Sequence, residues 1–367
     1  MSDKPIFVRI GYFLPSIPSR LRPINFSGRT ETVYAVECRA SVDTHVPPAG
    51  KGSANRRCWS SGIRERSMSE RFTVGWAGIG KMGAPMSRRV LDAGYALHVY
   101  EPLPENRATI VAEGANVAHS LEDLAAASDV IVLTIPNDAV LRELVFSPGG
   151  LATTMKTGQI LVEMSTVSPA ISTEVNEAMS ALGVSYLRAP VSGSTATASS
   201  GTLSVMASGP EEAYKRVEPM FECFASRRFY VGEAEEARYL KLVLNALVGA
   251  TSALLGEALT LGLKGNLTVE TMLSVICESA VASPLIAYKR DLLVNRNFDP
   301  AFSVSQMMKD FDLILDAARA DHTPMYLASM IRQQYEAAYA GGQADKDFFV
   351  LFEQSERLAG LAPPSEK

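Results

Sequence analysis

Cysteine, histidine and tryptophan are scarce in this chain of 367 residues. The four cysteines and four histidines are widely scattered, and neither set has the spacing of metal ligands or of a dense disulfide framework. We therefore expect no metal site and a reducing compartment, with the cytoplasm as the default location. The cysteines are Cys38, Cys58, Cys223 and Cys277, and the histidines are His45, His98, His119 and His322.

Long apolar runs and a strong charge of one sign are also missing. The uncharged stretch Leu242–Gly256 is shorter than the roughly 20 apolar residues that cross a bilayer. We expect no membrane association and interpret this stretch as a helix buried between protein surfaces. The net charge of −5 argues against a general nucleic-acid-binding protein. The length predicts two domains, and a hydrophobic content of 47% is ample for their cores.

The first 71 residues differ in composition from the rest. Residues 1–67 carry eleven Lys and Arg against five Asp and Glu, with many Pro and Ser, so we expect a disordered basic extension. It is interpreted as an organellar transit peptide, a regulatory arm, or an upstream extension of a chain that truly starts at Met68. We favour the last interpretation because a βαβ pattern begins a few residues after Met68.

A dinucleotide-binding pattern follows. A β-prone run over 72–77 leads into a Gly-x-Gly-x-x-Gly motif, then a helix-compatible stretch over 84–93 and a second strand over 95–101. The first glycine permits a tight turn, the second lets backbone N–H groups approach a pyrophosphate, and the third lets the helix pack closely. The motif residues, all predicted to bind the cofactor, are Gly78, Ile79, Gly80, Lys81, Met82 and Gly83.

Glu101 ends the second predicted strand, 18 residues after Gly83. This is close to the distance expected of an acid that binds the adenosine ribose. A carboxylate there favours NAD and repels the 2′-phosphate of NADP, although Arg107 lies near enough to complicate the choice. The alternative is a solvated carboxylate at a strand end. We expect NAD as cofactor, with NADP less favoured.

The alternation of strands and helices continues over residues 129–136, 159–164, 186–194 and 201–206. We expect this pattern to end after Met206 and the chain to be helical from about Gly232. The sequence thus predicts an α/β fold with a Rossmann-like domain over 72–232 and an all-helical domain over 233–360. The run Ser165–Pro169 follows a predicted strand, where it would contact the cofactor, cap a helix, or do both.

Five blocks of the sequence form an ordered set: Gly78–Met86, Ser165–Pro169, Ala189–Gly193, Lys241–Asn245, and Lys309-Asp310 with the later Asp345–Phe348. Taken in order, they resemble the 3-hydroxyisobutyrate dehydrogenase (β-hydroxyacid dehydrogenase) family over roughly residues 72–357. The resemblance implies a 6-phosphogluconate-dehydrogenase-like fold, with a long helix starting near Ala234 that joins the two domains.

The resemblance implies that Lys241 is the catalytic acid/base and Asn245 its partner. At i and i+4 the two side chains share one helical face, and burial beside an apolar run would lower the pKa of the lysine. The alternative is a lysine that reaches from a helix entrance to water. Gly249, one turn further, would leave room for a ligand or for close helix packing.

The family resemblance also implies contacts to cofactor and substrate. It assigns Ile135, Pro136, Thr166 and Lys309 to the cofactor. It assigns the loop Ser192, Gly193 and Ser194 to the substrate carboxylate, although an ordinary turn is the alternative. Three positions depart from the family pattern: Arg188 usually is Asp, Ser194 often is Gly, and Leu244 often is Asn. Arg188 would pair with an additional acidic group of the substrate or face solvent.

The expected function is hydride transfer between NAD and a short β-hydroxyacid or its semialdehyde. An imine-reductase-like NADP-dependent enzyme is one alternative, but such enzymes usually carry another residue in place of Lys241. A catalytically silent dinucleotide-binding module is a second alternative, and retention of Lys241 argues against it. The resemblance further implies a homodimer or homotetramer.

Overall fold

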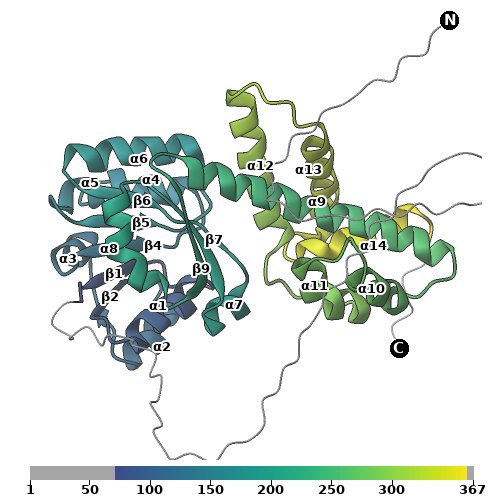
Figure 1. Cartoon of the computed structure of the whole chain (residues 1–367), viewed down its shortest axis with the longest axis horizontal. Coiled ribbons are helices and arrows are strands. Elements are labelled where there is room, and N and C mark those ends of the chain that lie inside the picture. Colours follow the sequence, from purple (N-terminus) through teal and green to yellow (C-terminus); the bar gives the residue numbers. More distant parts are fainter. Residues whose placement is uncertain (1–70, 362–367) are drawn as a thin grey trace, which may run out of the picture. The chain divides into compact units, whose positions relative to one another are not determined.

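The structure, a computed structural model, describes residues 71–361. Expectations about the basic extension and the start at Met68 lie outside the described residues, apart from Arg71. An α/β part comes first and a purely helical part follows (Figure 1). The predicted combination of a Rossmann-like domain with an all-helical domain is therefore confirmed.

Within the described part of the chain, nine strands form one sheet in the order β3-β2-β1-β4-β5-β6-β8-β7, with β9 paired to β8. Pairs among β1 to β6 are parallel, whereas β6 and β7 run antiparallel to β8. The order reverses at β1, and ligands of such sheets bind beside the carboxyl ends of the strands there. The strands are β1 (Val74–Ala77), β2 (Leu97–Tyr100), β3 (Asn116–Val117), β4 (Val130–Leu133), β5 (Ile160–Glu163), β6 (Ser185–Arg188), β7 (Val191–Ser192), β8 (Leu203–Ser208) and β9 (Ala225–Gly232).

Helices cover both faces of this sheet (Figure 1). Strands such as β4 are buried at every residue, which explains their continuous apolar sequence. One face packs against α1 (Gly83–Asp92), α2 (Pro104–Ala112), α7 (Thr195–Ser200) and α8 (Glu211–Phe221). The other packs against α3 (Leu121–Ala126), α4 (Asp138–Phe146), α5 (Leu151–Thr154) and α6 (Pro169–Ala181).

The expectation that the strand–helix pattern ends after Met206 was wrong. Helix α8 and strand β9 follow, and β9 pairs in parallel with β8. Among the described strands β9 pairs with β8 alone, and its Arg227 and Arg228 fit an edge strand, where charged side chains remain accessible to water. This polar sequence conceals the strand from a search for buried apolar runs.

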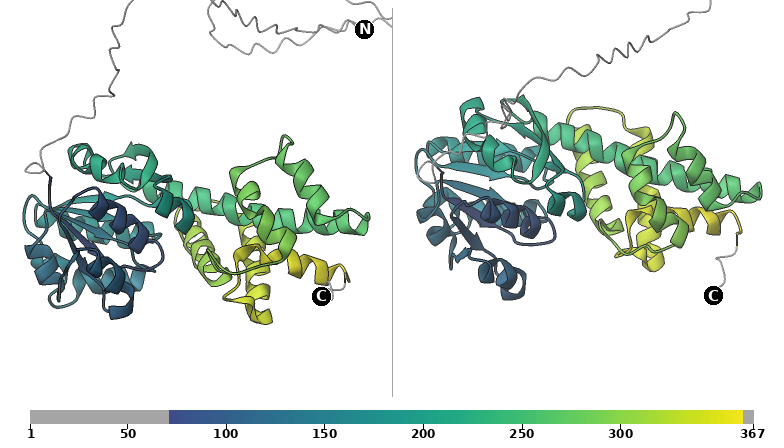
Figure 2. Two further views of the ribbon diagram at one scale, coloured as in Figure 1. Left: turned by 90° about the horizontal axis from the view of Figure 1, so that it is seen from below. Right: turned by 60° about the horizontal axis from the view of Figure 1, so that its bottom comes forward.

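The helical part is built around α9 (Glu236–Lys264), a helix of 29 residues that starts where the sequence predicts. Figure 2 shows this long helix with the later helices alongside it. A Cβ atom at Gly249 would lie 2.2 Å from the ring of Phe311, so this glycine serves close helix packing and not a ligand. The other elements are α10 (Val269–Cys277), α11 (Pro284–Asn295), α12 (Val304–Ala320), α13 (Tyr326–Ala338), the π-turn η2 (Tyr339–Gln343), the 3₁₀ turn η3 (Phe348–Val350) and α14 (Leu351–Leu358).

A buried ion pair explains the late Asp345–Phe348 block. Lys289 on α11 donates to the carboxylate of Asp347 at 2.5 Å, and its amine lies over the rings of Phe348 and Phe349. Both charged side chains are almost wholly buried, so each needs the other. This block therefore holds the helical domain together.

Helix α9 is the one described helix that is long and apolar enough to cross a membrane by length and composition. A core helix passes the same test, and α9 packs against α10, α12, α13 and α14. One such helix is weak evidence for a membrane span.

Candidate active site

The glycine motif forms the turn between β1 and α1, and its three glycines play different parts. Gly78 has φ +92°, and a Cβ there would lie 2.2 Å from the carbonyl oxygen of Thr134. A Cβ at Gly83 would lie 2.0 Å from the carbonyl oxygen of Gly78. At Gly80, by contrast, a Cβ would meet nothing within 4 Å. Gly78 and Gly83 are required by the protein itself, whereas Gly80 leaves open space beside the backbone.

The start of α1 suits an anion. Its N-cap, Met82, makes no side-chain capping bond, and the first turn contains no acidic residue. The first N–H groups of a helix lack intrahelical partners and carry partial positive charge, so they favour a phosphate. Thr134 fixes the turn, because its hydroxyl donates to the carbonyl of Gly78 at 2.6 Å and accepts from Trp76 Nε1 at 2.9 Å. Open space at Gly80 and this free helix start together fit a dinucleotide pyrophosphate.

Glu101 is buried at the end of β2 and braces the glycine turn. Its Oε2 accepts from the N–H of Ile79 at 2.8 Å, and its Oε1 accepts from the N–H of Leu103 at 3.1 Å. Arg107 donates to the main-chain carbonyl of Glu101 at 2.7 Å. Each carboxylate oxygen can accept a further hydrogen bond, so the side chain remains suited to a ribose hydroxyl.

The loop after β5 is tied to the loop after β4. Ser165 Oγ accepts from the N–H of Ile135 at 2.7 Å, while the neighbouring Pro136 is exposed. Ser168 caps α6 through the N–H of Ile171, and Pro169 is the first residue of that helix. The capping interpretation of Ser168 is thus confirmed.

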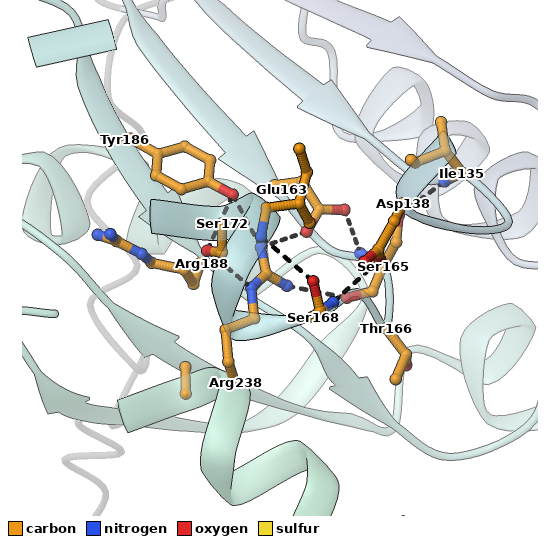
Figure 3. A network of polar contacts seen from close by, with 12 residues as sticks. Ile135, Asp138, Glu163, Ser165, Thr166, Ser168, Ser172, Tyr186, Arg188 and Arg238 are labelled. Carbon is orange, nitrogen blue, oxygen red and sulfur yellow. Dashed lines mark hydrogen bonds and ion pairs between the residues drawn. The ribbon is translucent and has the colours of Figure 1, made fainter. Parts of the chain in front are cut away.

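Arg238, in the first turn of α9, is the centre of a buried network (Figure 3). Its guanidinium donates to the carbonyl of Ser165 at 2.9 Å, to the hydroxyl of Tyr186 at 3.0 Å and to that of Ser172 at 3.2 Å. It also forms an ion pair with Glu163, whose Oε1 accepts from the N–H of Ser165 at 2.7 Å. Burial alone would lower the pKa of Arg238, but Glu163 and Tyr186 raise it, so the guanidinium stays charged.

Lys241 and Asn245 lie one and two turns further along α9, on the same face as Arg238. Asn245 Nδ2 donates to Oδ2 of the buried Asp310 on α12. The neighbouring Lys309 pairs with Asp310 Oδ1 at 3.0 Å and donates to the carbonyl of Thr166 at 2.7 Å. These contacts join α9 and α12 to the loop after β5.

The Lys241 side chain is half-buried and has no hydrogen-bond or ion-pair partner within residues 71–361. Burial lowers the pKa of Lys241, Asp310 opposes this shift, and Lys309 adds to it. A lysine with a lowered pKa and no fixed partner gives up its proton more readily than an ordinary lysine, as an acid/base requires. A lysine that reaches from the helix to water would also be half-buried, so the role of Lys241 stays a prediction.

The predicted substrate loop lies between β7 and α7. Gly193 has φ +140°, and a Cβ there would lie 2.4 Å from Thr197 Oγ1. Ser194 caps α7 reciprocally with Thr197, which gives a local reason for serine at this position. The hydroxyl of Ser192 has no partner in the described part of the chain. No hydrogen bond or ion pair between described residues joins this loop to Lys241 or Asn245.

Both expectations for Arg188 were wrong. The side chain neither faces solvent nor is free to meet a ligand, because it is buried at the end of β6. Its Nε and Nη2 donate to Glu235 Oε1 at 2.9 and 2.5 Å, and its guanidinium lies 4.7 Å from the ring centroid of Tyr186. Arg188 therefore holds β6 to the start of α9.

Three residues of this region are missing from the sequence-based site: Glu163, Arg238 and Asp310. Signals for them exist in the sequence. Glu163 is an acid at the end of an apolar strand, Arg238 precedes Lys241 by one helical turn, and Asp310 is followed directly by Phe311 on a buried face. What sequence cannot supply is the pairing of Glu163 with Arg238, which are 75 positions apart.

No three or more His, Cys, Asp or Glu side chains within residues 71–361 are grouped so as to hold a metal ion. Comparison with known proteins then identifies the family. Residues 73–232 match the NAD-binding domain of 6-phosphogluconate dehydrogenase, and residues 236–353 match the NAD-binding domain of NADP-dependent 3-hydroxyisobutyrate dehydrogenase.

The chain belongs to the 3-hydroxyisobutyrate dehydrogenase (β-hydroxyacid dehydrogenase) family. It is 30% identical to 2-(hydroxymethyl)glutarate dehydrogenase of Eubacterium barkeri, over 80% of this chain and 98% of that one. It is 28% identical to the mitochondrial 3-hydroxyisobutyrate dehydrogenase of Mus musculus, over 79% and 89% of the two chains. The crystal structure of 3-hydroxyisobutyrate dehydrogenase from Salmonella typhimurium is 30% identical and superposes with a TM-score of 0.71, covering 77% and 99%. These relatives support an NAD(P)-dependent hydroxyacid dehydrogenase.

Replacing Gly80 with alanine tests the pyrophosphate site. The added methyl group meets nothing in the protein but occupies the space beside the backbone N–H groups. We expect an unchanged melting temperature and a dinucleotide dissociation constant raised about tenfold, or about 1.4 kcal/mol, by fluorescence titration. Gly83→Ala is the matched control, because its methyl group would collide with the Gly78 carbonyl and lower the melting temperature. Unchanged affinity in Gly80→Ala would exclude this turn from the cofactor site.

Proposed function

We propose that this protein is an NAD-dependent dehydrogenase of a short β-hydroxyacid, with Lys241 as its acid/base. One observation carries the proposal. The half-buried amine of Lys241, which has no partner among residues 71–361, lies on α9 near the buried Asp310, and Lys309 links the same cluster to the loop after β5. A lysine in these surroundings can exchange a proton with a substrate oxygen.

In the oxidation direction, Lys241 Nζ must be neutral to accept the proton of the substrate hydroxyl. Bound NAD supplies the hydride acceptor for the hydrogen on the same carbon, so the C–OH group becomes a carbonyl. In reduction, the ammonium of Lys241 returns the proton to the carbonyl oxygen. Asn245 retains its side-chain oxygen, while its Nδ2 is held by Asp310. The second N–H of Asn245 Nδ2 is then available to donate to the reacting oxygen, which can accept it both as a hydroxyl and as a carbonyl.

The segment Ser192, Gly193 and Ser194 is proposed to bind the substrate carboxylate. A free serine hydroxyl and a left-handed glycine beside it suit an anion, because N–H groups in such turns converge. Arg188 is already neutralised by Glu235 and offers no cation to a second carboxylate. We therefore favour substrates with one carboxylate, such as 3-hydroxyisobutyrate or 3-hydroxypropionate, over dicarboxylates.

NAD is proposed in preference to NADP. Support comes from Glu101, whose buried carboxylate would oppose a 2′-phosphate, and from Arg107, whose guanidinium is engaged with a main-chain carbonyl. Ile79, Lys81, Met82, Ile135, Pro136, Thr166 and Lys309 are the further residues proposed to line the cofactor.

A homodimer or homotetramer remains our prediction for the assembly. Its support is the row of apolar side chains that α9 exposes, including Val243, Leu247, Leu254 and Leu261. Contiguous apolar side chains on a surface commonly mark an interface between subunits.

Lys241→Met should abolish catalysis without abolishing cofactor binding. Methionine fills similar space but carries no proton, so we expect kcat to fall by about 10³-fold with the NAD dissociation constant within about threefold of wild type. The assay is NADH formation with a panel of β-hydroxyacids, alongside a fluorescence titration. Lys264→Met, at the exposed far end of α9, is the control. Near-normal turnover in Lys241→Met would refute the assignment.

Glu101→Gln should weaken the discrimination between cofactors. Glutamine keeps an oxygen for the N–H of Ile79 but removes the negative charge, so we expect the ratio of kcat/KM for NAD over NADP to fall about tenfold. Glu105→Gln, an exposed neighbour on α2, should leave the ratio unchanged. An unaltered ratio in Glu101→Gln would remove this carboxylate from the ribose site.

A further inference from the structure

Two buried ion pairs join the sheet to the start of α9 in crossed order. Glu163 and Arg188 are register partners at the ends of the neighbouring strands β5 and β6. Glu235 and Arg238 lie one turn apart where α9 begins. The strand acid pairs with the helix base, and the strand base pairs with the helix acid. In one contact the strand supplies the negative charge, and in the adjacent contact the strand supplies the positive charge.

This arrangement of charges distinguishes the observed position of α9 from positions in which the helix is rotated or shifted. A rotation or a slip of the helix that exchanged the two contacts would bring Glu163 towards Glu235 and Arg188 towards Arg238. Like charges that are buried together are strongly unfavourable, because little water screens them. The observed position of α9 is the one in which each of the four charged groups meets a group of opposite charge.

The same setting determines what Lys241 meets. Arg238 donates to the carbonyl of Ser165, and Lys309 donates to the carbonyl of the next residue, Thr166. Asn245 and Asp310 close the ring between α9 and α12. The loop that carries Thr166 thus accepts hydrogen bonds from cationic side chains of two helices, α9 and α12. Lys241 lies between Arg238 and Asn245 along α9.

Resting on the function proposed above, we propose that the crossed pairs are a registration device that sets Lys241 against the cofactor loop, with Arg238 as a positioning residue. Stability alone is a poor reason for such pairs, because a buried pair is often no more stabilising than apolar side chains of similar volume. Specification of a single docking is the better-attested use of buried charge. Removal of the charges should therefore impair catalysis more than folding.

The test is the double variant Glu163→Gln/Arg238→Met in the full chain. The single variant Arg238→Met would leave Glu163 buried without a partner and lose stability, whereas the neutral double variant avoids this. We expect its melting temperature within about 4 °C of wild type. We expect its NAD dissociation constant within about threefold, with kcat per folded enzyme lower by about 10- to 100-fold.

A kinetic signature separates positioning from loss of folded enzyme. With substrate deuterated at the carbinol carbon, the isotope effect on kcat should rise in the double variant, because hydride transfer becomes slow relative to product release. The matched control is Lys289→Met/Asp347→Asn, a neutralised buried pair within the helical domain. The control should leave both kcat and the isotope effect unchanged, whatever its melting temperature.

A double variant with both the kcat and the melting temperature of wild type would overturn the registration proposal. Amide hydrogen exchange gives a readout that needs no turnover. Exchange over residues 164–168 and 236–245 should increase in the double variant and stay unchanged in the control, and equal protection in both would also overturn the proposal. A wild-type protein that binds NAD but oxidises no hydroxyacid would instead contradict the proposed function, and the exchange experiment would still decide the registration.

Discussion

The hydrogen bond from Arg238 to the carbonyl of Ser165 joins the helix that bears Lys241 to the loop proposed to bind the cofactor. Arg238 remains charged there because Glu163 compensates for its burial. Without that pair, α9 would be joined to the loop after β5 only indirectly, because Asn245 contacts Asp310 on α12 and the neighbouring Lys309 contacts Thr166. The position of the candidate acid/base thus depends on a contact that takes no part in the proposed reaction.

The balance of charges around Lys241 follows from that geometry. Burial disfavours the ammonium, Asp310 favours it, and Lys309 disfavours it again. Asp310 is itself engaged on both sides, by Asn245 and by Lys309. One carboxylate therefore orients an amide, holds a cation that reaches the loop, and limits how far the pKa of Lys241 falls.

The sequence predicts the fold where the physics is local. The glycine motif, the apolar parallel strands and the start of α9 can each be deduced from short segments, because turn geometry and burial constrain their residues directly. Strand β9 could not be deduced, because Arg227 and Arg228 hide an edge strand. Arg188 and Glu235 are 47 positions apart, and no local pattern shows that one neutralises the other. Lys241 became a candidate through the family resemblance, whereas its electrostatic surroundings required coordinates.

The most direct test of the central claim is the pH dependence of kcat/KM for hydroxyacid oxidation, in wild type and in Asp310→Asn. Oxidation requires neutral Lys241, so kcat/KM should rise through a pKa below the ordinary lysine value of about 10.4. Asp310 raises the pKa of Lys241, so Asp310→Asn should move this rise to lower pH. A rise that stays in place or moves to higher pH would contradict the account.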